Sequence, residues 1–100
     1  MCSTALCIYN KWVKIAFDRV KDAANLQKHG ASLADAIHLD WSSMLIVTDT
    51  RRDYGEDRYQ GFGVIGSRLY FVAFTPRDDT MRVISFRKAN NREIHDYEQN

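Results

Sequence analysis

The stretch that decides the fold is RYQGFGVIGSRLYFVAFTPRDDTMRVISFRK, residues 58–88. It contains successive apolar runs, and a turn signal separates each run from the next: Gly66 with Ser67, then Pro76 with the polar residues after it. The middle run, residues 67–75, is almost continuously apolar, which is typical of a strand covered on both faces. The stretch therefore predicts a meander of antiparallel strands with residues 67–75 at its centre.

Shorter segments before the meander also have the patterns of strands. Residues 13–17, VKIAF, alternate larger apolar side chains with Lys14 and Ala16, as a half-buried strand does. Residues 44–49, MLIVTD, form a compact apolar run, and a polar loop over residues 50–57 leads from it into the meander. Together these segments predict a sheet.

The residues between these strands predict two helices. Asp18 has the chemistry of a helix N-cap, and Gly30 fits the left-handed residue that ends a helix. Ser32 then begins a second, short helix, with Asp35 in the spacing of a capping box. The apolar stripe of the first helix is expected to consist of Val20, Ala23, Ala24 and Gln27.

The C-terminal residues, ANNREIHDYEQ (89–99), predict a third helix with Ile94 and Tyr97 on its docking side. The expected fold is therefore a small α+β domain, with an antiparallel sheet of about four to five strands, two N-terminal helices and a C-terminal helix. Residues 13–98 are expected to form this single domain, and residues 1–12 an N-terminal tail or an extra edge segment.

Length and composition are those of one ordinary globular domain. The 100 residues suffice for one hydrophobic core, with 45% hydrophobic and 27% charged residues. No apolar run is long enough to span a bilayer, and the first residues lack the pattern of a signal peptide. Cys2 and Cys7 are too few for a disulfide framework. A reduced cytoplasmic setting, with no membrane partner, is expected.

Arginines are concentrated in the second half of the chain, which holds eight of the nine, although the net charge is only +1. Arg82 and Arg87 lie within the last predicted strand, where alternation would place them on opposite faces of the sheet. Arginine favours planar, bidentate contacts with phosphate or carboxylate. The alternative is surface salt bridging with nearby acidic residues: Asp53, Glu56, Asp57, Asp78 and Asp79.

Neighbouring strands of the meander can bring several arginines over one patch: Arg58, Arg77, Arg82 and Arg87. Such a patch would suit a phosphodiester, because charge grows as phosphorus becomes five-coordinate and fixed cationic donors stabilise that species. RNA also carries its own nucleophile, the 2′-hydroxyl, so a protein needs only to position the RNA, move protons and neutralise charge. That chemistry requires neither a metal nor a cofactor.

His29 is a candidate for proton transfer, since an imidazole exchanges protons near neutral pH. The alternative is a helix-terminal role, in which Lys28 and His29 complement the helix dipole before Gly30. His38 and His95 lack ligand spacing with a cysteine or a carboxylate, so no metal site is predicted. The glycines of GFGVIG lie inside the strand meander rather than before a helix, which argues against a phosphate-binding loop.

Residues 17–36, FDRVKDAANLQKHGASLADA, and residues 55–98, which begin GEDRYQGFGVIG, together resemble the BrnT family. These are ribonuclease toxins of type II toxin–antitoxin modules, with a fold similar to that of RelE toxins. The resemblance is carried by Asn25 with KHG, by EDR entering a strand, and by RVISFRKANNRE with Tyr97 after it. It covers most of the chain, from about residue 13 to residue 98.

The resemblance implies metal-independent RNA cleavage in the bacterial cytoplasm, with no cofactor, and a consequent arrest of translation. It also implies inhibition by a BrnA-like antitoxin, whose DNA-binding part would bring the pair to operator DNA. The alternative is a non-catalytic homologue that keeps the fold and acts as an antitoxin-binding transcriptional co-repressor.

Residue roles follow from the same resemblance. Arg58, Arg77 and Arg82 would bind phosphate and stabilise the charge of the transition state. His29 would transfer protons, and Lys28 would contact the RNA backbone. The remaining residue, Arg87, matches the second arginine of the family's final strand and would bind RNA; alternatively, it would hold the terminal helix through Glu93.

Overall fold

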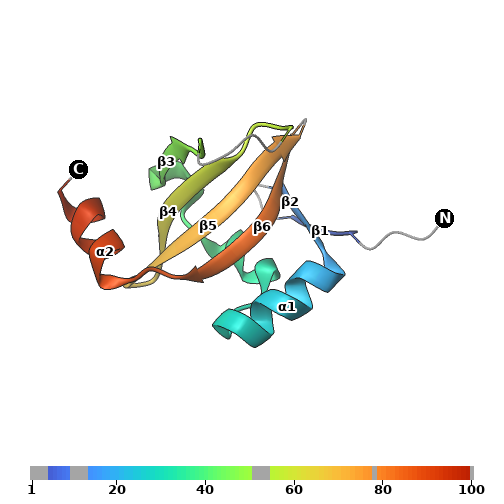
Figure 1. Cartoon of the computed structure of the whole chain (residues 1–100), viewed down its shortest axis with the longest axis horizontal. Coiled ribbons are helices and arrows are strands. Elements are labelled where there is room, and N and C mark those ends of the chain that lie inside the picture. The colour runs from blue at the N-terminus through green and yellow to red at the C-terminus, as the bar shows by residue number, and fades with distance from the viewer. Residues whose placement is uncertain (1–4, 10–13, 51–54, 78, 100) are drawn as a thin grey trace.

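The computed structural model describes residues 5–9, 14–50, 55–77 and 79–99. The elements in chain order are β1 (Ala5–Tyr9), β2 (Lys14–Asp18), α1 (Arg19–His29), the 3-10 segments η1 (Leu33–His38) and η2 (Trp41–Ser43), β3 (Leu45–Thr48), β4 (Tyr59–Ile65), β5 (Arg68–Arg77), β6 (Thr80–Lys88) and α2 (Asn91–Glu98) (Figure 1). This is an α+β fold, as the sequence predicts.

The strands form one six-stranded sheet in the order β1-β2-β6-β5-β4-β3. The predicted meander is confirmed, because β4, β5 and β6 pair antiparallel in sequence and β3 pairs antiparallel with β4. The sheet differs from expectation in its sixth strand, since Ala5–Tyr9 pairs with β2 at the edge, and in the parallel pairing of β2 with β6. Of residues 1–12, the expected tail or edge segment, only this edge strand lies among the described residues.

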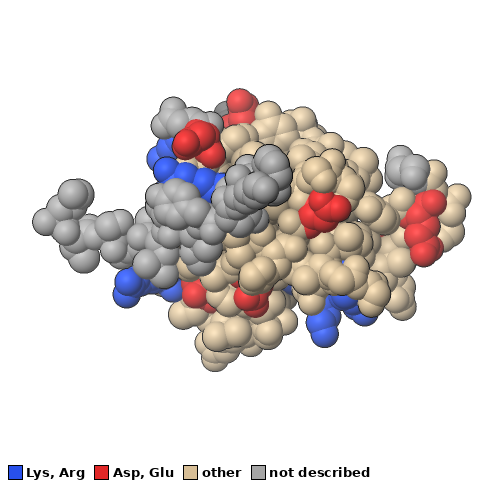
Figure 2. Space-filling view, turned by 180° about the vertical axis from the view of Figure 1, so that it is seen from behind, with Lys and Arg blue, Asp and Glu red and all other residues tan. Residues whose placement is uncertain are grey.

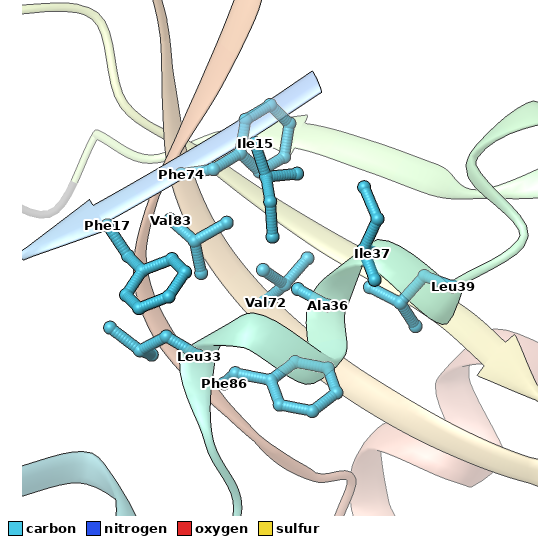
Figure 3. Close-up of a cluster of buried hydrophobic side chains, with 10 residues drawn as sticks. All are labelled: Ile15, Phe17, Leu33, Ala36, Ile37, Leu39, Val72, Phe74, Val83 and Phe86. Atoms are coloured by element: carbon cyan, nitrogen blue, oxygen red, sulfur yellow. The ribbon is translucent and has the colours of Figure 1, made fainter. Parts of the chain in front are cut away.

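The hydrophobic core lies between the sheet and η1 (Figure 3). Strand β5 lies between β4 and β6, and residues 71–75 of this strand are all buried, which confirms its central position. Trp41 closes one end of the core by placing its ring edge-on to Phe74, with 5.4 Å between the centroids. The core cluster consists of Ile15, Phe17, Leu33, Ala36, Ile37, Leu39, Val72, Phe74, Val83 and Phe86.

Helix α1 packs beside an edge of β6 through a buried asparagine. Strand β2 pairs with β6 only from Thr80 to Arg82, so the rest of that edge is left to α1. The Asn25 amide nitrogen donates to the carbonyl of Phe86 at 2.7 Å, and its side-chain oxygen accepts from the N–H of Phe86 at 3.2 Å. Buried backbone groups need hydrogen-bond partners. Asn25 provides the two hydrogen bonds that a residue of a neighbouring strand would otherwise make with Phe86.

The ends of α1 are as predicted, but its buried face is polar. The Asp18 side chain accepts from the N–H of Val20 at 2.7 Å, and Gly30 ends the helix at φ 72°. Val20 itself is 71% exposed, and Asn25 is the buried residue of the helix. The predicted stripe is therefore wrong as a packing face, because its other members are also exposed: Ala23, Ala24 and Gln27.

The second predicted helix is the short 3-10 segment η1, followed by η2. Ser32 is its N-cap, as expected. The carboxylate that supports this cap belongs to Asp22 of α1 rather than to Asp35. It accepts from the hydroxyl of Ser32 at 2.9 Å and from the N–H of Leu33 at 2.7 Å. The two helical segments are thus joined by a tertiary cap that fixes the turn after α1.

Helix α2 confirms the predicted C-terminal helix and projects beyond the end of the sheet (Figure 1). It begins with a capping box, in which the N–H of Glu93 donates to the Asn90 side chain at 2.8 Å and the N–H of Asn90 donates to the Glu93 carboxylate at 2.9 Å. No helix within the described ranges combines the length and the hydropathy that crossing a membrane requires.

Candidate nucleic-acid interface

A bulge in β6 decides where the arginines of this strand point. The pairing of β5 with β6 shifts after Ala73, which leaves Ile84 as an extra residue in β6. The extra residue reverses the alternation of side chains along the rest of the strand. Arg82 and Arg87 therefore lie on the same face of the sheet, and the expectation of opposite faces is wrong.

The sheet register brings together the predicted phosphate-binding arginines. Arg82 lies opposite Thr75 of the central strand. The register of β4 with β5, continued by one residue, brings Arg58 to the other side of Thr75. Arg77 follows Thr75 by two positions on the same strand and shares its face. We call the four residues the arginine face; it is opposite to the face on which Phe74 enters the core.

Glu56 adds a carboxylate to the arginine face that the sequence analysis did not assign to the site. The hydroxyl of Thr75 donates to one Glu56 oxygen at 3.3 Å, and Nε of Arg58 lies 3.5 Å from the same oxygen. Its signal in the sequence is the EDR that enters the strand, which the resemblance includes and which offers Glu56 as a possible salt-bridge partner. The arginine face thus includes a proton acceptor as well as cations.

The salt-bridge alternative holds for some of these arginines and not for others. Arg58 has Glu56 as a partner, and its side chain is only 22% exposed. Within the described residues, neither Arg77 nor Arg82 forms an ion pair or a side-chain hydrogen bond. Asp53 and Asp78, which were among the proposed partners, lie outside the described residues. Arg82 is half-buried, whereas Arg77 is exposed.

Arg87 is engaged within the protein. Its guanidinium makes a bidentate pair with the Glu93 carboxylate, at 2.7 and 2.8 Å, and lies 4.3 Å from the centre of the Phe71 ring. The hydrogen bond from Arg87 holds the pKa of Glu93 below its usual value, against the opposing effect of burial. These contacts support the structural alternative for Arg87, which ties β6 to the start of α2.

His29 lies at the end of α1, beside a different part of β6. It lines the same hollow as Phe86 and Lys88, whereas Lys28 beside it is exposed. Burial lowers the pKa of the His29 imidazole, and the positive charges of Lys28 and Arg87 lower it further. The imidazole is therefore biased towards its neutral form, in which one ring nitrogen can accept a proton.

The predicted site residues thus fall into two groups. Arg58, Arg77 and Arg82 share the arginine face, whereas His29, Lys28 and Arg87 belong to the region near Phe86. That residue is four positions from Arg82, a separation of roughly 13 Å along an extended strand. Glu56 contacts Thr75, the residue opposite Arg82, whereas His29 lines grooves beside the segment of β6 from Ile84 to Lys88.

Figure 2 shows the face of the molecule opposite to that seen in Figure 1. This face is mostly uncharged, with lysine and arginine side chains near its margins. In the ranges that the structure describes, no group of three or more histidine, cysteine, aspartate or glutamate side chains could hold a metal ion.

Residues 17–93 match the family model described as "Ribonuclease toxin, BrnT, of type II toxin-antitoxin system". The matched range includes α1, the whole meander and every residue of the arginine face. No curated protein matches the chain.

Proposed function

Because the chain belongs to the BrnT family of ribonuclease toxins of type II toxin–antitoxin systems, we propose that it is a metal-independent endoribonuclease that cuts RNA on the arginine face and so arrests translation. The observation that carries this proposal is the row Arg58–Thr75–Arg82 across three adjacent strands, with Glu56 against it. It joins cationic donors and a carboxylate in a patch small enough for one phosphodiester.

The cleavage uses the RNA's own 2′-hydroxyl. Its oxygen attacks the adjacent phosphorus, the bond from phosphorus to the 5′ oxygen breaks, and a 2′,3′-cyclic phosphate and a 5′-hydroxyl end result. Arg58, Arg77 and Arg82 stabilise the five-coordinate phosphorus, because they are cationic donors on the face where its negative charge accumulates. Glu56 accepts the proton of the 2′-hydroxyl, and the 5′ oxygen takes a proton from solvent.

Glu56 is favoured over His29 as the proton acceptor because of distance. A general base must come within hydrogen-bonding reach of the proton that it removes. Glu56 contacts both Thr75 and Arg58, whereas His29 lies beside the segment of β6 from Ile84 to Lys88. We assign His29 and Lys28 to the RNA backbone on one side of the cut, and keep His29 as the second candidate for the base.

The same face suits an inhibitor. A BrnA-like antitoxin that presents acidic side chains to Arg77 and Arg82 would neutralise the charge that RNA needs, since inhibitors of anion sites commonly present anions. The toxin and antitoxin would together bind operator DNA through the antitoxin. The cytoplasm, where RNA and ribosomes are available, is the proposed location.

The test is incubation of the antitoxin-free protein with a defined single-stranded RNA in excess EDTA. The parent protein should produce fragments with 2′,3′-cyclic phosphate ends, and Arg82→Ala should not. Arg92→Ala is the matched control, because Arg92 is an exposed arginine on α2. If folded parent protein cuts neither this RNA nor ribosome-bound messenger RNA, the ribonuclease proposal fails. Tight antitoxin binding together with that result would favour the co-repressor.

A further inference from the structure

A hollow of about 420 Å³ lies beside the end of α1, between η1 and the C-terminal part of β6. The proposed cleavage chemistry uses none of its interior. Its walls include Asp35, His38, Tyr70, Phe86 and Lys88, with His29 at the helix end. The volume lies within the usual range for small-molecule sites, roughly 300–1,000 Å³.

The polar side chains of this hollow have hydrogen-bonding capacity that the fold does not use. No hydrogen bond or ion pair joins the side chains of Asp35, His38, Tyr70 and Lys88 to any other described residue. Asp35, His38 and Lys88 are also exposed. The hollow therefore presents a carboxylate acceptor and an ammonium donor that remain available to a ligand.

One wall of the hollow is aromatic, with Tyr70 half-buried and Phe86 buried behind it. The rings of Tyr70 and Phe86 are stacked, with 5.0 Å between their centroids and 7° between their planes. Ile65 adds an apolar side chain to the same lining. Flat aromatic surfaces beside cationic groups are where single-stranded nucleic acids place their bases.

We propose that this hollow binds a guanine base of the RNA, an inference that rests on the proposed ribonuclease function. A carboxylate at Asp35 can accept both N1–H and the N2 amino group, two adjacent donors that guanine presents and adenine and uracil do not. Lys88 can donate to O6 and N7 of the same base, which are both acceptors. Cytosine offers a single amino donor beside an acceptor that the carboxylate would repel.

The position of the hollow suits a nucleobase next to the phosphodiester that is cut. His29 lines this hollow and also the groove between α1 and β6, where Lys28 lies. Tyr70 and Phe86 lie on the core face of the sheet, opposite to the arginine face. An RNA strand that leaves the arginine face would therefore have to pass round the edge of β6, along the groove that Lys28 and His29 line, to reach the hollow. The hollow would then select the sequence context of cleavage without touching the reacting atoms.

Binding of guanosine 5′-monophosphate tests the inference without cleavage. In NMR titrations, this nucleotide should shift the signals of Asp35, His38 and Tyr70. Adenosine 5′-monophosphate should bind at least about tenfold more weakly, as expected when hydrogen bonds to a charged group are lost. Because the two nucleotides share the phosphate and the sugar, the difference isolates the base.

Asp35→Asn should bring the two nucleotides to similar affinities, whereas Glu98→Gln, which alters an exposed glutamate of α2, should leave the preference unchanged. Equal affinities in the parent, or shifts confined to Arg77 and Arg82, would overturn the guanine site. RNA cutting separates the two proposals: active parent protein with no preference for guanine contradicts only the hollow. Guanine-selective binding without any cutting contradicts only the ribonuclease.

Discussion

Arg82 and Arg87 lie on the same strand and the same face of the sheet, yet they have different surroundings. Arg87 is engaged, with two hydrogen bonds to Glu93, one to the carbonyl of Lys88, and the ring of Phe71 beneath its guanidinium. Arg82 has no ion pair among the described residues and lies beside Thr75. An arginine whose donors are already used contributes to stability, and one whose donors have no partner in the protein is available to an anionic substrate.

The largest expected effect is the loss of RNA cleavage when Arg82 is replaced. Arg82→Ala should lower the single-turnover rate of RNA cleavage by about 10³-fold, because it removes a fixed donor to the transition state. The free energy of unfolding should change by no more than about 0.5 kcal/mol, since the side chain has no partner to lose. Arg82→Lys should restore part of the rate, because the charge returns without the planar fork. An unchanged rate in Arg82→Ala would remove Arg82 from the site.

The second-largest expected effect is a slower cleavage when Glu56, the proposed general base, is replaced. Glu56→Gln keeps the shape of the side chain and removes its ability to accept a proton, so the rate should fall by about 10²-fold. His29→Asn should lower it by far less, because His29 lies near Phe86. Pre-steady-state cleavage of one labelled RNA measures both variants. If His29→Asn were instead the slower variant, His29 rather than Glu56 would be the general base.

Arg87→Ala should lower stability and spare cleavage, the opposite of what is expected for Arg82→Ala. Its loss removes the bidentate pair with Glu93, so urea unfolding should show a decrease of about 1–2 kcal/mol in stability. Cleavage by the folded variant should stay within about threefold of the parent, a change of less than 1 kcal/mol in the barrier. A large loss of rate in protein that is fully folded would show that Arg87 also binds RNA.

The smallest expected effect is a change with pH in the stability that the Arg87–Glu93 pair contributes. Arg87 lowers the pKa of Glu93 in the folded protein, so the folded state binds the proton less readily than the unfolded chain. The resulting stability is present above the unfolded pKa, roughly 4.3, and is lost as the pH falls through the lower folded value. The difference in unfolding free energy between the parent and Glu93→Gln should therefore shrink from pH 7 to pH 3. A difference that does not change with pH would contradict the ionic role.

Local signals in the sequence predicted the elements of this fold well. Asp18 and Gly30 mark the ends of α1 by their own chemistry, and Gly66 marks the turn between β4 and β5. The prediction that Pro76 ends the central strand is wrong, because β5 continues to Arg77 and Pro76 pairs with Met81. Because consecutive antiparallel strands are neighbours, the meander also allowed the grouping of Arg58, Arg77 and Arg82 to be predicted.

Features set by contacts between distant segments could not be predicted in this way. The bulge at Ile84 has no local marker, and it alone reverses the side on which Arg87 lies. Asn25 and Asp22 give α1 a polar buried face because their partners are backbone groups of other segments, which no hydrophobic period reveals. The place of Glu56 depends on Thr75, a residue of another strand.

The most direct test of the central claim is a titration with a 2′-O-methyl RNA oligomer, which cannot be cut because its nucleophile is blocked. NMR signals of the arginine Nε–H groups report each guanidinium separately. The signals of Arg77 and Arg82 should shift in proportion to bound oligomer, and that of Arg87 should stay where it is while Glu93 holds it. Shifts at Arg87 and His29 without any at Arg82 would contradict the assignment of RNA cleavage to the arginine face.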